Sequence, residues 1–137
     1  MKSRSESLIR LKKFQVDEKR RQLTQIEMMV ADFERMASEL DQQIEIEQHK
    51  TGISDVAHFA YSTFAKAAIS RRDNLLASAK DMKDKLERAQ DELAEAVEDL
   101  KKVELLDQRE HSRELAVEAK IEQDGYDEIA RFRHMRS

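Results

Sequence analysis

Apolar residues recur every seven positions in two rows along the first third of the chain. The rows lie three residues apart, which is the spacing of the two seam positions of a coiled coil. Six heptads keep this spacing, so they predict one long helix from about residue 3 to residue 50. The first row is Ile9, Val16, Leu23, Val30, Ala37 and Ile44, and the second is Lys12, Lys19, Ile26, Phe33, Leu40 and Glu47.

A second pattern of the same kind runs from about residue 75 to residue 122. Acidic residues interrupt its seam, whereas lysines interrupt the seam of the first pattern. Its two rows are Ala79, Leu86, Leu93, Leu100, Asp107, Glu114 and Ile121, and Leu75, Met82, Ala89, Ala96, Val103, Glu110 and Val117. The two patterns therefore predict two long helices whose seams are interrupted by charges of opposite sign.

The charged seam residues of the two helices face each other when the chain folds back on itself. In an antiparallel pair, the numbers of facing residues add up to a constant. A constant of 126 sets both seam lysines opposite acidic residues and, for example, Leu40 opposite Leu86. A shift by one heptad would put Lys19 against Leu100 or Asp107 against Ile26, at a cost of several kcal/mol. The predicted register-setting pairs are Lys12 with Glu114 and Lys19 with Asp107.

The expected fold is all-α, a long antiparallel two-stranded coiled-coil hairpin with a short helical apex. Gly52 suits the end of the first helix. Ser54 offers the N-cap of a short helix at about 54–70. A single domain is expected over 1–137, with a helix at about 3–50, an apical segment at 52–74, a return helix at about 75–122 and a C-terminal tail at 125–137.

The composition agrees with long helices and excludes several classes of protein. Charged residues make up 39% of the chain, and proline, tryptophan and cysteine are absent. Disorder is the rival interpretation of so much charge, but the regular apolar spacing argues against it. The start of the chain lacks the apolar core of a secretory signal, and no apolar run reaches the roughly 18–20 residues of a membrane span. A soluble, cytoplasmic protein without disulfides is expected.

Charge is spread unevenly. The net charge of −4 combines +5 over residues 1–21, +3 over 131–137 and −12 over the rest. Exposed apolar residues near both basic ends suggest a surface for a partner, unless the tail folds back and covers them. The candidate residues at the basic end are Arg10, Leu11, Lys13, Phe14, Arg20, Arg21, Ile129, Arg131, Phe132 and Arg133.

Aromatic residues gather at the predicted apex. They form a second candidate partner site, or they cap the core of the hairpin. The candidate residues are His58, Phe59, Tyr61 and Phe64.

Signals for catalysis and cofactors are missing from the sequence. It has no glycine-rich phosphate loop, no nucleophile elbow and no Glu-x-x-His pair of the kind that binds metals in helical bundles. Neither an enzyme nor a cofactor or metal site is expected. Nucleic acid is not an expected partner either, because basic-region recognition needs a parallel helix dimer and the shaft is acidic.

The stretch "ESLIRLKKFQVDEKRRQLTQIEMMVADFERMASEL" at residues 6–40, with the hairpin after it, resembles the flagellar FliJ family in its alpha-proteobacterial form. The resemblance implies a non-enzymatic, stalk-like component of the flagellar export apparatus. It also implies the hexameric export ATPase FliI and the export gate protein FlhA as partners, and possible contact with export chaperones. The expected location is cytoplasmic, peripherally associated with the export gate at the inner membrane and without membrane insertion. The alternative is a structural or adaptor coiled coil, including a homodimer whose seams pair between chains.

Overall fold

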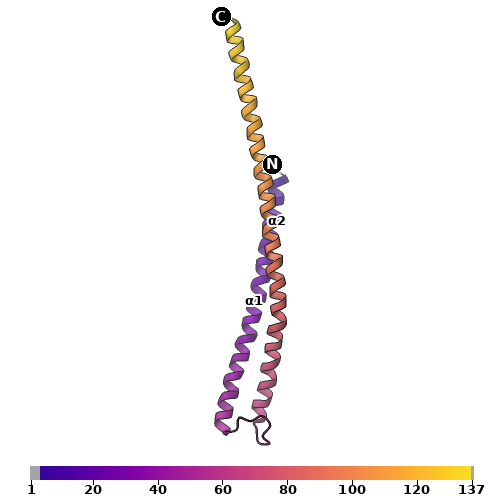
Figure 1. Cartoon of the computed structure of the whole chain (residues 1–137), viewed down its shortest axis with the longest axis vertical. Coiled ribbons are helices and arrows are strands. Elements are labelled where there is room, and N and C mark those ends of the chain that lie inside the picture. Colours follow the sequence, from indigo (N-terminus) through magenta and orange to yellow (C-terminus); the bar gives the residue numbers. More distant parts are fainter. Residues whose placement is uncertain (1–3, 137) are drawn as a thin grey trace. The chain divides into compact units, whose positions relative to one another are not determined.

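Two long helices and the loop between them make up the described chain. The computed structural model describes residues 4–136, in which α1 spans Arg4–Thr51 and α2 spans Thr63–Arg136. The helices pack against each other as a hairpin, and the loop at 52–62 reverses the chain between them (Figure 1). The described residues contain no strand. The predicted all-α hairpin is therefore confirmed.

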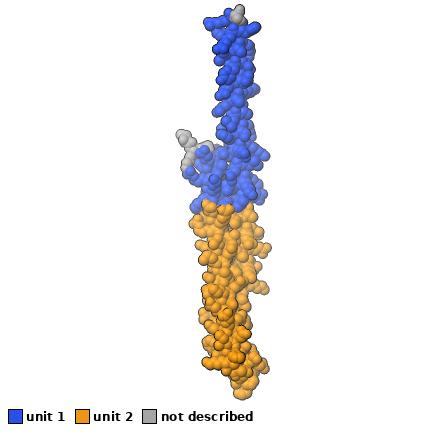
Figure 2. Space-filling model, turned by 90° about the vertical axis from the view of Figure 1, so that its left-hand side faces the viewer, with its two compact units in different colours: residues 1–16, 96–137 blue, residues 17–95 orange. Residues whose placement is uncertain are grey.

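The chain divides into two compact units, coloured separately in Figure 2. Unit 1 comprises residues 1–16 and 96–137, and unit 2 comprises residues 17–95. Unit 2 thus holds the loop and the parts of both helices that adjoin it. The assignment of all 137 residues to one domain stays a prediction.

Small and branched apolar side chains fill the seam of unit 2. Ala65 is fully buried and Ala37 is only 2% exposed, which indicates a close approach of the two helices at these positions. The buried residues of unit 2 are Val30, Ala37, Ile44, Tyr61, Ala65, Ala68, Ala79 and Ala89. Burial follows both predicted rows in α1 and follows the rows of α2 as far as Asp107. The predicted seam is therefore correct up to that residue, and the later seam positions of α2 are exposed.

Contacts across the seam of unit 2 set a register that differs from the predicted one. Three ion pairs join the helices there, and their residue numbers add up to 111, 113 and 117. The pairs are Lys19 Nζ with Glu92 Oε2 at 3.0 Å, Arg72 Nη1 with Asp41 Oδ1 at 2.9 Å, and Lys83 Nζ with Glu34 Oε1 at 3.0 Å. The sums of 111 and 113 lie next to 112, which keeps the heptad phase and is two heptads below 126, and all three sums are at least nine below 126.

Unit 1 shows the same displacement. The Ser5 hydroxyl donates a hydrogen bond of 3.3 Å to Glu110 Oε2, and these two residue numbers add up to 115. Glu114 therefore lies one helical turn beyond the level of Ser5, far from Lys12. Lys12 is half-buried in the seam and Glu114 is exposed. The predicted pairing of Lys12 with Glu114 is wrong, and Lys19 pairs with Glu92 in place of Asp107.

The displacement follows from where α2 begins. α2 starts at Thr63 rather than near residue 75, and no separate helix forms at 54–70. The first turns of α2 place Ala65 and Ala68 in the seam. The two helices therefore pair directly after the loop at 52–62. The centre of the hairpin consequently falls inside the loop at 52–62 rather than at residue 63. At its other end α2 continues through Gly125 to Arg136, so the predicted end near 122 and the separate tail are also wrong.

A cysteine cross-linking experiment tests the register inside unit 2. Leu40 and Leu75 line the same small cavity, so Leu40→Cys with Leu75→Cys should be joined efficiently by a short thiol cross-linker. The control pair, Leu40→Cys with Leu86→Cys, has the predicted register of 126. Residue 86 lies eleven residues further along α2, about 16 Å at the rise of a helix, so this pair should not react. Because the chain has no native cysteine, every cross-linked product joins the two introduced cysteines and can be identified directly by mass spectrometry. Preferred cross-linking of the control pair would contradict the register.

Candidate partner-binding surfaces

The loop at 52–62 begins with a glycine that ends α1. Gly52 has a positive φ of 73°, a conformation that glycine adopts without steric cost. Its N–H donates a 2.9 Å hydrogen bond to the Gln48 carbonyl oxygen, which is the αL termination of a helix. The Thr51 hydroxyl accepts a hydrogen bond from the Ile53 N–H at 3.3 Å. The chain therefore leaves α1 in a defined direction, as the glycine predicts.

Ser62, and not Ser54, caps the helix that follows. Its hydroxyl accepts a hydrogen bond from the Ala65 N–H at 3.2 Å, and it donates one to Glu47 Oε1 at 3.1 Å. The first contact satisfies an otherwise unpaired N–H at the start of α2, and the second ties this end to α1. The predicted cap at Ser54 is wrong because the chain there makes turns. The Ala57 N–H donates to Asp55 Oδ1 at 3.0 Å, and the His58 N–H donates to the Asp55 carbonyl oxygen at 3.0 Å.

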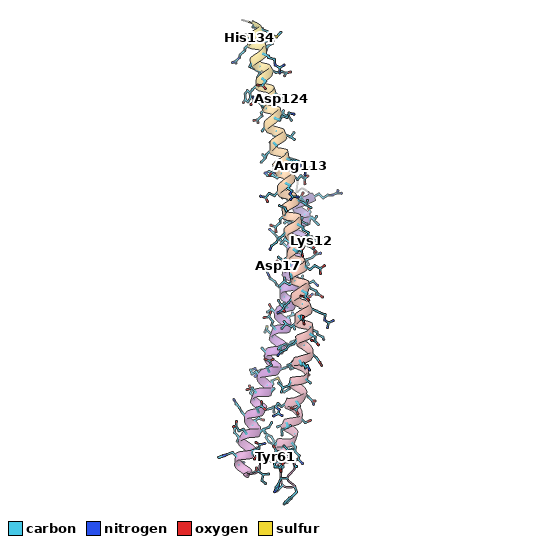
Figure 3. All side chains as sticks on the ribbon, in the orientation of Figure 1. Lys12, Asp17, Tyr61, Arg113, Asp124 and His134 are labelled. Atoms are coloured by element: carbon cyan, nitrogen blue, oxygen red, sulfur yellow. The ribbon has the colours of Figure 1, made fainter. Side chains whose placement is uncertain are left out.

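Tyr61 is a structural residue of the loop and not part of an exposed site. Its side chain is 5% exposed, and Gln48 Nε2 donates a 2.8 Å hydrogen bond to its hydroxyl oxygen. Figure 3 labels it where the loop meets the ends of the two helices. Of the two interpretations of the apical aromatic residues, capping of the core therefore holds for Tyr61.

Phe59 and Phe64 are the exposed aromatic residues of the loop region. Phe59 is 96% exposed and Phe64 is 56% exposed. The ring of His58 stacks on that of Phe59 with centroids 4.7 Å apart, and His58 Nδ1 accepts a 3.0 Å hydrogen bond from the Ala60 N–H. These contacts hold an apolar ring in solvent on an ordered turn. Such a ring is suited to insertion into a pocket of a partner.

The outer face of α1 in unit 1 carries apolar side chains between basic ones. Leu11 is 49% exposed and Phe14 is 58% exposed. Arg10 and Lys13 lie beside them on α1 and are exposed too. An exposed leucine and phenylalanine one turn apart, bordered by cations, have the composition of a protein-binding patch.

The remaining basic candidates lie elsewhere. Arg20 and Arg21 are exposed residues of unit 2, and Arg21 Nη1 pairs with Glu18 Oε1 at 3.0 Å. Arg131 is an exposed residue near the end of α2. Ile129, Phe132 and Arg133 line one shallow groove there. In unit 1 they lie about 30 Å beyond the level of Ser5, at 1.5 Å per residue from Glu110, so α2 does not fold back onto Leu11 and Phe14.

Sequence reasoning missed Arg72, which lies within the expected apical segment at 52–74. It occupies a seam position, and its guanidinium bonds both Asp41 and Asp73, at 2.9 and 3.0 Å. Hydrogen bonds raise the pKa of Arg72 above its ordinary value. The bond with Asp41 has the larger effect, and the bond with Asp73 the next. The guanidinium therefore stays charged, and it fastens the start of α2 to α1. The only signal in the sequence is the seven-residue spacing from Ala65 and Ala79.

A metal site requires grouped ligand side chains, and a membrane span requires a long apolar helix. Among residues 4–136, no three histidine, cysteine or acidic side chains are grouped so that they could hold a metal ion. Neither long helix contains, within the same residues, an apolar stretch of the length and hydropathy that a membrane span requires.

The fold and its surfaces define an α-helical hairpin of the coiled-coil class, with exposed apolar side chains as its accessible features. The model of the family described as "Flagellar FliJ protein" matches residues 1–137, which is the whole sequence. The chain therefore belongs to the FliJ family and is a component of flagellar protein export. No curated protein and no solved structure matched it.

Proposed function

We propose that this chain acts as a non-enzymatic stalk that binds the hexameric, FliI-like export ATPase and connects it to the FlhA-like export gate. Membership of the FliJ family supports this role. The observation that carries the proposal is the exposed patch on α1, in which Leu11 and Phe14 lie beside Arg10 and Lys13. The end of α2, with Ile129, Arg131, Phe132 and Arg133, and the basic residues Arg20 and Arg21 add to the same proposed ATPase-binding set.

The dimensions of a two-helix hairpin suit such a role. Each helix is about 10–12 Å wide with its side chains, so a pair of helices is narrow enough to enter the pore of a ring. Exposed ion pairs contribute only about 0–1 kcal/mol each, which allows the contacts with ring loops to form and break. We place the basic end in the ring.

We assign the contact with the export gate to the loop. Phe59 and Phe64, with His58 beside them, are the residues proposed to contact it, and Tyr61 holds the loop in shape from inside. Export chaperones are further proposed partners. The chain acts in the cytoplasm, peripherally at the inner membrane, without inserting into the bilayer, without nucleic acid and without a cofactor.

Titration of the cognate export ATPase with the full chain tests the proposal. The chain should raise the rate of ATP hydrolysis. The triple variant Arg10→Glu, Lys13→Glu and Phe14→Ala should raise the half-saturating concentration about tenfold or more. This corresponds to a loss of roughly 1.4 kcal/mol or more of binding free energy. Lys80→Glu with Lys85→Glu changes charge by the same amount at other exposed residues and serves as the control.

The outcomes separate the stalk from the alternative adaptor. An ATPase whose rate does not respond to the wild-type chain, or a triple variant that acts like the control, would argue for a structural coiled coil without an ATPase role. For the other end, Phe59→Ala should weaken binding to the cytoplasmic part of the gate protein. Leu76→Ala, which removes an exposed leucine of α2, should not.

A further inference from the structure

The last third of α2 has an apolar stripe that no part of α1 covers. In unit 1, α1 is at the level of Glu110 when it reaches Ser5. Beyond Asp107, all described residues are exposed except the half-buried Gly125. Figure 3 labels Asp124 and His134 on this single stretch of helix, with no described segment of unit 1 beside it.

The stripe continues the seam that packs on α1. Glu114 and Glu128 also fall in the sector of roughly 120° that, on a helix of 3.6 residues per turn, holds the apolar members of the stripe. The apolar members are Val117, Ile121, Ile129, Phe132 and Met135, which are 56%, 65%, 53%, 58% and 85% exposed. Gly125 lies in the middle of the sector, where a Cβ atom would meet nothing within 4 Å. A glycine here lets a second helix approach closely at the centre of the stripe.

Charge is separated along the same segment. Residues 114–128 contain six acidic residues and one lysine, a net −5, while residues 131–136 contain three arginines. A parallel copy would place acidic against acidic and basic against basic. An antiparallel copy places each basic end along the acidic part of the other, so the segment is complementary to itself.

We propose that the segment at 113–136 pairs with the same segment of a second copy of the chain, antiparallel, about a two-fold axis near Gly125. The stripes then meet with Val117 facing Met135 and Ile121 facing Phe132. Because the interface is isologous, every contact occurs twice.

The flanking charges fit this arrangement. Glu118 and Arg136 lie at one edge of the stripe, inside its sector, and Glu122 and Arg133 lie just beyond the same edge. Like flanks meet in an antiparallel helix pair, so Arg133 and Arg136 of one copy lie beside Glu118 and Glu122 of the other. Arg136 already stacks over Phe132, with Cζ 4.9 Å from the ring centroid, which leaves its N–H groups available at the rim. The contacts stand independently of the proposed function, but they use Ile129 and Phe132, so self-pairing and ATPase binding by this end exclude each other.

Sedimentation equilibrium of the full chain over a range of concentrations tests the pairing. The wild-type chain should be in monomer–dimer equilibrium. Arg133→Glu with Arg136→Glu should weaken dimerisation about tenfold or more, as should Glu118→Arg with Glu122→Arg. An equimolar mixture of the two variants should recover part of the affinity through mixed dimers. Lys80→Glu with Lys85→Glu should have no effect.

Single cysteines give the orientation, since none is native. Gly125→Cys should form a disulfide between copies. Val117→Cys alone should not, because its two copies would lie about 27 Å apart, whereas a mixture of Val117→Cys with Met135→Cys should. A chain that stays monomeric at its solubility limit would overturn the proposal. So would a dimer that ignores the charge reversals, and so would Val117→Cys cross-linking with itself.

Discussion

Replacement of Ala37 by aspartate is expected to lower the free energy of unfolding by about 3–5 kcal/mol, the cost of an unpaired charge in an apolar interior. Ala37 is 2% exposed and belongs to the first seam row of α1. Its neighbours along that row, Val30 and Ile44, are buried and apolar, and Arg72 of α2, at the level one turn further along α1, is already paired with Asp41. Urea unfolding followed by circular dichroism at 222 nm measures the change.

The matched control is Ala31→Asp, the same substitution in the same helix at an exposed residue. It should cost no more than the difference in helix propensity, about 0.7 kcal/mol or less. Equal losses in the two variants would mean that Ala37 is not in the seam. A larger loss at Ala31 would mean that the buried face of α1 is the opposite one.

The seam itself could be predicted because its signal is local. Heptad spacing states which face of a helix is apolar, and the burial of Val16, Val30 and Ile44 agrees with it. In the same way, the exposure of Leu11 and Phe14 agrees with their predicted outward positions. Their role in binding stays a prediction.

The register could not be predicted because heptad spacing is degenerate. Any sum that differs by seven satisfies the same seam, so the choice depends on where the second helix starts. That start rests on the competition between Ser54 and Ser62 as caps. Asp55 decides it, because its side chain bonds the backbone N–H of Ala57, and such a turn competes with a helix. Neither the Asp55 side-chain hydrogen bond nor the Ser62 cap is visible in a hydrophobic pattern.

The electrostatic rule used to choose the register also failed for a physical reason. It treated Lys12 and Lys19 as buried charges that require facing acids. Both lysines are only half-buried, and the Lys19 side chain is 35% exposed, with its ammonium 3.0 Å from Glu92 at the edge of the seam. A lysine can cover apolar surface with its stem while its charge stays in water. The penalty that favoured 126 is therefore small in this hairpin.

Substitution of both seam lysines by leucine is accordingly expected to stabilise the protein, by about 1–2 kcal/mol in total. Leucine at residues 12 and 19 would extend the apolar row of Ile26, Phe33 and Leu40 and remove two charges from the seam. Each buried methylene contributes about 0.8 kcal/mol. The lost pair with Glu92 is a partly exposed one, worth about 0–1 kcal/mol. Urea unfolding should show a higher midpoint with an unchanged slope.

The control for this prediction is Lys13→Leu, which makes the same change at an exposed residue of α1 and should alter the free energy of unfolding by less than about 0.5 kcal/mol. A double variant that is destabilised by more than the control would show that the lysines have carboxylate partners at full depth, as the register of 126 requires. Stabilisation confined to the double variant would instead mean that these two residues lower stability where they stand. Because polar seam residues can select one alignment over others, the stabilised variant should also be tested with the Leu40 cysteine pairs. In it, cross-linking to residue 75 should stay preferred over residue 86, because a register of 126 would set the new leucines opposite Glu114 and Asp107.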